Sequence, residues 1–316
     1  MMKIAILDDF QDVVKDLDCF SLLQNHDVHI FTHGARGVGQ LAVRLASFDA
    51  VVLIRERTAF SRTLLQKLPN LKLISQTGKV AGHIDLKAAA ELGITIAEGV
   101  GDPTAPAELT WALIMASMRK IPQYASYLRE GLWQTASTTP GSNTLGSVLK
   151  GRTLGIWGYG KIGKLVAGYG RAFGMHVLVW GSEAGRQRAT ADDIDVADSR
   201  EQFFASADVL TLHLRLNDLT RACVQESDFL HMKPTALFVN TSRAELVQPG
   251  ALLAAVLRGQ PAALDVFEME PLAPESPFLH LSNVLATPHL GYVEQASYEI
   301  YFRAAFQNIV DYATTI

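Results

Sequence analysis

The chain has 316 residues, which is long for one hydrophobic core and suits two domains. Hydrophobic residues make up 48% and charged residues 19%, as in ordinary globular proteins, and the net charge of −4 argues against a nucleic-acid partner or an anionic membrane surface. The two cysteines, Cys19 and Cys223, have no C-x-x-C partner, which excludes a disulfide framework and a cysteine-rich zinc site.

The N-terminal apolar run is too short for a signal peptide, and no later segment approaches the length of a membrane span. We therefore expect a cytoplasmic protein that binds small molecules. No residue pattern indicates a metal site.

In the first part of the chain, short apolar runs alternate with helical patterns, and this alternation predicts a parallel sheet with helices on its faces. The predicted strands are Lys3–Leu7, Val28–Thr32, Ala50–Ile54, Leu71–Gln76 and Ile94–Ala97. The predicted helices between them are Leu41–Ala46, Ser61–Leu68 and Leu86–Leu92.

A second α/β region follows a predicted helix over Ala107–Arg119 and a polar segment, Thr135–Ser147, that is typical of a surface loop. Its predicted strands are Leu154–Trp157, His176–Trp180, Val209–His213, Ala236–Asn240, Ala262–Asp265 and Val284–Ala286. One helix over Glu294–Tyr312 ends the chain. The sequence thus predicts an α/β protein with two Rossmann-like, doubly wound parallel-sheet domains.

A G-x-G-x-x-G motif at Gly158, Gly160 and Gly163 lies between a predicted strand and a predicted helix. Glycines at these places permit a tight turn, a close approach to a pyrophosphate and close packing of helix on strand, and the helix N-terminus favours the anion. A ligand-free glycine turn is the alternative. The predicted dinucleotide contacts here are Gly158, Tyr159, Gly160, Lys161, Ile162 and Gly163.

From Ile54 onward the chain resembles the D-isomer-specific 2-hydroxyacid dehydrogenases, the family of D-lactate, D-glycerate and D-3-phosphoglycerate dehydrogenases. The resemblance rests on the glycine motif followed in order by Ala207-Asp208-Val209, Asn240-Thr241-Ser242-Arg243, Leu264-Asp265-Val266-Phe267-Glu268-Met269-Glu270-Pro271 and Thr287-Pro288-His289. The chain is similar to the short form, which lacks the C-terminal regulatory domain of longer phosphoglycerate dehydrogenases.

The resemblance implies a flavodoxin-like substrate domain made of residues 1–101 and 289–316, and an NAD(P)-binding Rossmann domain made of residues 102–288. It also implies an active cleft between the domains and a homodimer formed through the nucleotide-binding domains. Further cofactor contacts that it implies are His213, Thr241, Ser242 and Asp265, the last of which would hydrogen-bond the nicotinamide amide.

The family's reaction transfers a hydride between NAD(P)(H) and a D-2-hydroxy acid or 2-keto acid, and it needs a group that moves the accompanying proton. His289 suits this role because an imidazole holds or releases a proton near neutral pH. Glu270 would orient the ring and favour its charged form, and Arg243 would bind the substrate carboxylate and carbonyl. Each residue alone is more often structural, but the ordered trio after a nucleotide motif favours catalysis.

The resemblance also implies that backbone N–H groups of a loop after the fourth strand hold the substrate carboxylate. Here this loop contains Gly78, with Lys79 and Val80 presenting the amides. The family normally has glycine where Val80 stands, which changes the conformations open to the loop.

Arg55 and Arg57 match an Arg-x-Arg pattern with which phosphoglycerate dehydrogenases contact phosphate. The alternative is a solvated strand end in which Glu56 pairs locally with an arginine. A phosphorylated substrate therefore stays open.

Cofactor choice is open as well. The second strand of the dinucleotide unit ends at Gly181, where NAD-specific enzymes have a carboxylate for the adenosine ribose. Ser182 with Arg186 or Arg188 would suit a 2′-phosphate, whereas Glu183 would suit a ribose. The cofactor is NAD or NADP.

Two other functions occur on this fold and are alternatives to dehydrogenation of a hydroxy acid. Some relatives act as dinucleotide-sensing corepressors, a role that does not require turnover. Formate-oxidising relatives carry glutamine where Glu270 stands, which argues against formate oxidation here.

Overall fold

The computed structural model describes residues 1–133 and 145–315. The chain forms two compact units, one from Met1–Asp102 with Val293–Ile316 and the other from Pro103–Tyr292. The sequence analysis ended the nucleotide-binding domain at residue 288, whereas the second unit also contains residues 289–292 and therefore His289. The predicted surface loop lies outside the described residues up to residue 144.

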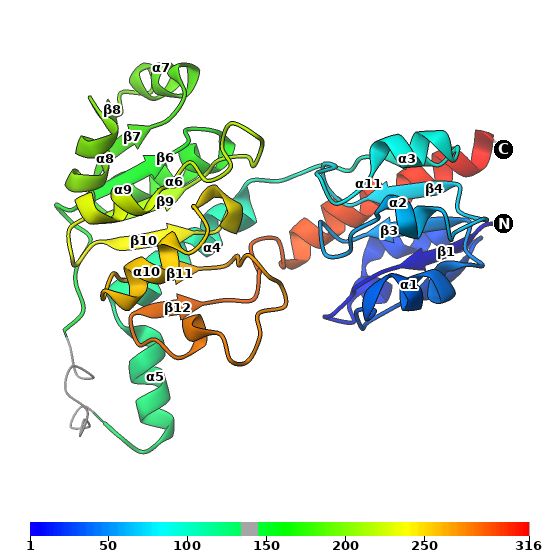
Figure 1. Cartoon of the computed structure of the whole chain (residues 1–316), viewed down its shortest axis with the longest axis horizontal. Coiled ribbons are helices and arrows are strands. Elements are labelled where there is room, and N and C mark those ends of the chain that lie inside the picture. The colour runs from blue at the N-terminus through cyan, green and yellow to red at the C-terminus, as the bar shows by residue number, and fades with distance from the viewer. Residues whose placement is uncertain (134–144, 316) are drawn as a thin grey trace. The chain divides into compact units, whose positions relative to one another are not determined.

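The first unit is built on a parallel sheet with the strand order β2-β1-β3-β4-β5 (Figure 1). Its strands are β1 (Lys3–Ile6), β2 (Asp27–Ile30), β3 (Ala50–Leu53), β4 (Leu73–Gln76) and β5 (Thr95–Ala97). All five predicted strands are confirmed to within two residues at each end. The three inner strands, β1, β3 and β4, are almost wholly buried, as expected for a sheet covered on both faces.

Helices cover both faces of this sheet. The helices α1 (Gly37–Leu45), α2 (Arg62–Leu65) and α3 (Leu86–Glu91) contribute to one core, in which Leu41 and Leu64 pack with Val51. The C-terminal helix α11 (Gln295–Thr315) contacts β3 and β4 and packs on the 3₁₀ helix η2 (Asp18–Leu23), which follows the shorter η1 (Val14–Asp16).

The second unit contains a longer parallel sheet with the order β12-β11-β10-β9-β6-β7-β8. The strands are β6 (Thr153–Trp157), β7 (His176–Trp180), β8 (Asp195–Val196), β9 (Val209–Leu212), β10 (Leu237–Asn240), β11 (Ala262–Leu264) and β12 (Val284–Ala286). The sequence predicted all of them except the two-residue edge strand β8, which is too short to form a pattern. The fold class is therefore confirmed.

Successive residues of the central strands point to opposite faces of this sheet and enter separate cores. Leu210 and Leu212 pack on one face, while Val209, Leu237 and Val239 pack on the other. The helices are α4 (Thr104–Met118), α5 (Ile121–Arg129), α6 (Lys161–Ala172), α7 (Glu183–Ala191), α8 (Arg200–Ser206), α9 (Glu226–His231) and α10 (Ala251–Leu257), with 3₁₀ turns η3 (Ala244–Leu246) and η4 (Pro277–Leu279).

The strand order of the second unit reverses between β6 and β9, which are neighbours in the sheet. Ligands of such sheets bind beyond the carboxyl ends of the strands at this reversal. The glycine motif follows β6 and His213 follows β9, so the fold brings both to this edge. None of the described helices combines the length and apolar character of a membrane span.

Candidate active site

The turn between β6 and α6 accepts only glycine at two of its three motif positions. Gly158 has a φ of +105°, and a β-carbon there would lie 2.5 Å from the carbonyl oxygen of His213. A β-carbon at Gly163 would lie 2.2 Å from the carbonyl oxygen of Gly158. These close approaches of backbone to backbone fix the tight turn and seat α6 against the sheet.

Gly160 differs from the other two glycines because it is exposed and a β-carbon added to it would meet nothing within 4 Å. It is the N-cap residue of the twelve-residue α6, and no side chain caps this helix end. The open space beside uncapped N–H groups fits the pyrophosphate of a dinucleotide.

Two of the side chains next to these glycines make contacts within the fold and are not available to a ligand. Tyr159 is buried and its hydroxyl donates to Asp192 Oδ2 at 2.9 Å, and Ile162 packs against the core. Lys161 is the exposed first residue of α6. The backbone of this segment, rather than its side chains, is therefore positioned to contact a phosphate.

The end of β7 has no carboxylate at Gly181 or Ser182, and Gly181 has a φ of +149°. Ser182 is the N-cap of α7, where its hydroxyl accepts the N–H of Gly185 at 3.3 Å. A serine cap of this kind stabilises the start of the helix.

Two arginines of α7 contact residues at or near the N-terminus of this helix. Arg186 pairs with Glu183 at 2.9 Å and stacks over the ring of Trp180, 5.1 Å from its centre. Arg188 donates from Nη2 to the carbonyl oxygen of Tyr159 at 3.1 Å. The guanidinium of Arg188 thus bridges α7 and the glycine turn.

The predicted acid/base pair is formed in the second unit. His289 Nδ1 lies 2.7 Å from Glu270 Oε2, and Glu270 Oε1 accepts the N–H of Phe267 at 2.9 Å. The edge of the Tyr292 ring packs on the imidazole, with the ring centres 5.6 Å apart. Within the described residues, His289 Nε2 makes no hydrogen bond, so this nitrogen is available to a ligand.

The charge on Glu270 is favoured by its surroundings. Burial alone would raise the pKa of this carboxyl, but the hydrogen bond and charge of His289 outweigh burial, together with the Phe267 amide and the charge of Arg243. The pKa of Glu270 therefore lies below its ordinary value, and the group is a carboxylate at neutral pH.

Asp265 holds the turn that carries His289. Its carboxylate accepts the hydroxyl of Thr287 at 2.6 Å and the N–H groups of Leu290 at 2.7 Å and Gly291 at 2.9 Å. His289 has a φ of +55°, a conformation that needs support from its surroundings in a residue other than glycine. The buried Asp265 supplies this support on both sides of the histidine.

Burial raises the pKa of Asp265, although Thr287, the two amides and the charge of His289 act in the opposite direction. Both carboxylate oxygens accept bonds from the 287–291 segment. The sequence analysis assigned Asp265 to the nicotinamide amide, and its part in supporting the histidine turn was missed. No local pattern indicates this contact, because the partners of Asp265 lie 22 to 26 residues further along the chain.

Arg243 follows β10 at the start of η3. Asn240 Nδ2 donates to the carbonyl oxygen of Arg243 at 2.9 Å, and Arg243 Nη1 donates to the carbonyl oxygen of Ser242 at 2.6 Å. The neighbouring hydroxyls have partners within the fold: Thr241 bonds Thr110 of α4 at 2.7 Å, and Ser242 donates to Leu212 at 2.7 Å.

His213 lies directly after β9, with Nε2 3.1 Å from the hydroxyl of Thr211. Burial lowers its pKa to about 3, so the ring is neutral at physiological pH. Its Nδ1 is buried and has no hydrogen-bond partner within the described residues. A neutral, incompletely bonded histidine beside the glycine turn is compatible with a cofactor contact.

The predicted substrate loop follows β4 in the first unit. The guanidinium of Arg55 lies against Gly78 so closely that a β-carbon there would be 2.3 Å from Nη1. Val80 already donates its N–H to Glu98 Oε1 at 2.9 Å, and Lys79 Nζ pairs with Glu98 Oε2 at 2.8 Å. The sequence analysis missed Glu98, which follows β5.

The second arginine of the Arg-x-Arg pattern is held within the first unit. Arg57 Nη1 donates to the carbonyl oxygen of Asp8, and its guanidinium stacks 4.7 Å from the centre of the Phe10 ring. Arg55 has a φ of +53°, and its Nε is 4.0 Å from Glu56. The local pairing with Glu56 that the sequence offered as an alternative is present.

The parallel-sheet fold, the glycine turn after β6 and the contact between His289 and Glu270 are those expected of a dinucleotide-dependent oxidoreductase. A family model described as the NAD-binding domain of D-isomer-specific 2-hydroxyacid dehydrogenases matches residues 111–291, more than half of the chain. The chain belongs to this family of NAD-dependent enzymes, which act on small 2-hydroxy and 2-keto acids.

Relatives and solved structures agree with this assignment. A glyoxylate reductase from Aeropyrum pernix is 37% identical over 255 residues, covering 79% of this chain and 76% of that protein. A D-3-phosphoglycerate dehydrogenase from Archaeoglobus fulgidus is 33% identical, covering 80% of this chain and 47% of that protein, so the chain spans about half of its length. A phosphoglycerate oxidoreductase structure from Vibrio cholerae O395 is 54% identical with a TM-score of 0.96 and full coverage of both chains. None of these comparisons supports the corepressor alternative.

Proposed function

We propose that this protein reduces a small 2-keto acid to the D-2-hydroxy acid, and catalyses the reverse oxidation, with His289 as the acid/base. The observation that carries this proposal is the 2.7 Å contact between His289 and Glu270. This contact orients the ring and keeps Nε2 available for the substrate oxygen.

When bound, NAD(P)H would supply the hydride that the carbonyl carbon accepts. His289 Nε2 donates the proton to the carbonyl oxygen, which completes the hydroxy acid, and takes it back in the oxidation. The Glu270 carboxylate favours the imidazolium that gives the proton, while Arg243 polarises the carbonyl and binds the substrate carboxylate. The glycine turn and α6 would hold the pyrophosphate, and His213, Thr241, Ser242 and Asp265 would be further cofactor contacts.

The loop after β4 is proposed to bind the substrate carboxylate. Within the described residues, the N–H groups of Gly78 and Lys79 have no protein acceptor, and the Arg55 guanidinium lies against Gly78. Val80 also belongs to this loop, but its N–H is bonded to Glu98.

An unphosphorylated acid is the favoured substrate. Arg57 already donates to Asp8 and stacks on Phe10, so its charge is held away from a ligand role. Relatives are named for both glyoxylate and phosphoglycerate, so both substrate types belong in the assay.

NADP(H) is a second cofactor candidate beside NAD(H). It is favoured by the missing carboxylate at Gly181, by the Ser182 hydroxyl and by the two α7 arginines next to the glycine turn. We expect Arg188→Gln to raise the Kd for NADPH about tenfold and to change the Kd for NADH little, as measured by fluorescence titration.

A homodimer through the nucleotide-binding unit is proposed from the surface of α5. This helix has no buried residue, and Ile121, Leu128 and the nearby Trp133 are each more than half exposed. Apolar surface of this kind commonly marks an interface. Sedimentation of the wild type and of Leu128→Asp tests it, since the variant should sediment as a monomer. A cytoplasmic location stays a prediction from the sequence.

The activity is tested with glyoxylate, pyruvate, hydroxypyruvate and 3-phosphohydroxypyruvate, each with NADH and with NADPH. We expect turnover of at least one unphosphorylated acid. Absence of turnover across the panel would contradict the proposal, and a clear preference for 3-phosphohydroxypyruvate would overturn the substrate class.

A further inference from the structure

A carboxylate of the chain occupies part of the proposed substrate loop. Glu98 accepts the Val80 N–H with one oxygen, at 2.9 Å, and the Lys79 ammonium with the other, at 2.8 Å. Both partners belong to the segment assigned to the substrate carboxylate. A backbone N–H and a cation are also the groups that a 2-keto acid carboxylate would use.

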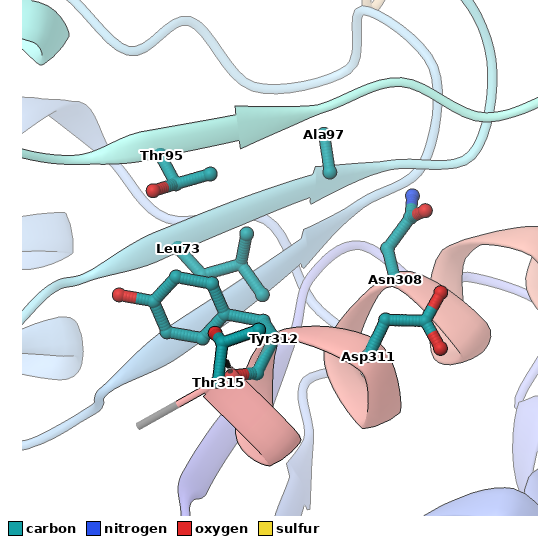
Figure 2. Close-up of a pocket in the computed structure, with 7 residues that line it drawn as sticks. All are labelled: Leu73, Thr95, Ala97, Asn308, Asp311, Tyr312 and Thr315. Atoms are coloured by element: carbon teal, nitrogen blue, oxygen red, sulfur yellow. Dashed lines mark hydrogen bonds between the residues drawn. The ribbon is translucent and has the colours of Figure 1, made fainter.

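The backbone of Glu98 is fixed independently of its side chain. Asn308 of α11 donates from Nδ2 to the carbonyl oxygen of Glu98 at 3.2 Å and to the Ser75 hydroxyl at 3.2 Å, and Figure 2 shows Asn308 beside the end of β5. Gly99 donates to the Gly78 carbonyl at 2.8 Å, and a β-carbon at Gly99 would lie 2.5 Å from the Gln76 carbonyl oxygen. A change in the Glu98 carboxylate therefore leaves the course of this segment intact.

The contacts of the Glu98 carboxylate are of a kind that a ligand can displace. The side chains of Lys79 and Glu98 are 65% and 42% exposed. Ion pairs this exposed contribute little to stability because water screens them and long side chains lose rotamer freedom. Replacing one carboxylate by another at Val80 and Lys79 keeps the same types of bond.

We propose that Glu98 is an internal competitor of the substrate: its carboxylate holds the place of the 2-keto acid carboxylate on Val80 and Lys79 and raises the KM. The inference rests on the proposed function, because it takes this loop as the carboxylate site. The substrate displaces the Glu98 side chain, and Lys79 transfers its ion pair to the incoming acid. Glu98 thereby sets the affinity for the acid without taking part in the transfer of hydride or proton.

The test compares the wild type with Glu98→Gln and Glu98→Asp, using glyoxylate at saturating cofactor and the unreactive analogue oxamate in calorimetric titrations. We expect KM for glyoxylate and Kd for oxamate to fall about fivefold in Glu98→Gln, with kcat within about twofold of the wild type. The shorter side chain of Glu98→Asp cannot reach both Val80 and Lys79. This variant should therefore also lower KM for glyoxylate and Kd for oxamate.

Glu91→Gln is the matched control, because Glu91 of α3 pairs with Arg62 of α2, whereas Lys79 and Val80 are bonded to Glu98. It should leave KM and kcat unchanged. An unchanged or raised KM, or a lower kcat, in both Glu98 variants would mean that Glu98 braces the loop, and would overturn the proposal. If the wild type turns over none of the acids, the proposed function fails, and the oxamate titration still decides whether Glu98 competes for an anion.

Discussion

The two units of this protein differ in the bonding of the charged groups assigned to the reaction. In the second unit, His289 and Glu270 are bonded to each other, supported by Asp265, and leave one imidazole nitrogen available. In the first unit, the Lys79 ammonium and the Val80 amide are already bonded to a carboxylate of the chain. On the proposed function, the second unit would present an assembled proton-transfer pair, and the first would present a binding loop with an internal competitor.

We infer that the second unit provides the groups for proton transfer and that the loop of the first unit selects the substrate. The proton-transfer pair needs fixed geometry, because small displacements of a catalytic group cost rate. A carboxylate-binding loop needs donors whose affinity can be adjusted, and an exposed internal carboxylate adjusts it without altering the backbone.

Among the effects on binding and stability, the strongest should be the loss of cofactor affinity in Gly160→Ala. A β-carbon there meets no protein atom, so the fold should be retained, but it enters the space assigned to the pyrophosphate. We expect the Kd for the dinucleotide to rise about 100-fold with little change in Tm. Gly163→Ala is the contrast, since its clash with the Gly158 backbone should lower Tm as well. Unaltered dinucleotide binding by Gly160→Ala would place the pyrophosphate elsewhere.

Asp265→Asn should lower kcat about 10- to 100-fold, because it weakens three bonds that hold the His289 turn. It should also cost about 2 kcal/mol of unfolding free energy. Asp208→Asn is the matched control: this partly buried carboxylate accepts the Thr153 N–H at 2.8 Å and pairs with Lys233, away from the turn. It should lose stability and keep kcat. Equal kcat losses in the two variants would argue against a specific role for Asp265.

Glu270→Gln should lower kcat about tenfold through poorer orientation and charging of His289. Its effect on stability should depend on pH. Since the folded-state pKa lies below the ordinary 4.5, the stabilisation is fully present above pH 4.5 and disappears as the pH falls through the folded-state pKa. The side chains of His289 and Glu270 are 24% and 36% exposed, so the difference at pH 7 should stay below about 1 kcal/mol. The free energies of unfolding of the wild type and Glu270→Gln are compared in urea at several pH values. A difference that grew toward low pH would contradict a lowered pKa of Glu270.

The last effect comes from His213 and is confined to the free energy of unfolding. Its pKa of about 3 lies below the ordinary 6.5, so the folded protein binds fewer protons than the unfolded chain between these values and loses stability on acidification. The wild type should lose about 1–2 kcal/mol more than His213→Asn between pH 7 and pH 5. Parallel stability curves for the two proteins would show that His213 is not held neutral.

The fold of the second unit was predicted from the sequence because its strands and glycine turn form short local patterns. Gly158 and Gly163 are required by backbone contacts within one turn, and His289 and Glu270 lie in segments with a recognisable order. Glu98 could not be found in this way, because its partners Lys79 and Val80 follow a different strand. Parallel neighbours end at one edge of a sheet, so a carboxylate directly after β5 was the available signal.

Other features depended on three-dimensional contacts that no pattern contains. The support of the His289 turn by Asp265 joins the end of β11 to the segment after β12, which are neighbours only in the folded sheet. Neither the helix α5 nor its exposed face was predicted, and because this helix has no buried residue, an apolar pattern there does not mark a covered side.

The central claim is that His289 transfers the proton while the first unit only selects the acid. Single-turnover oxidation of bound cofactor by glyoxylate, followed at 340 nm in the wild type, His289→Gln and Glu98→Gln, tests it most directly. We predict that His289→Gln binds cofactor normally and loses about 100- to 10,000-fold in rate, while Glu98→Gln keeps the wild-type rate at saturating glyoxylate. A near-wild-type rate in His289→Gln would contradict the account.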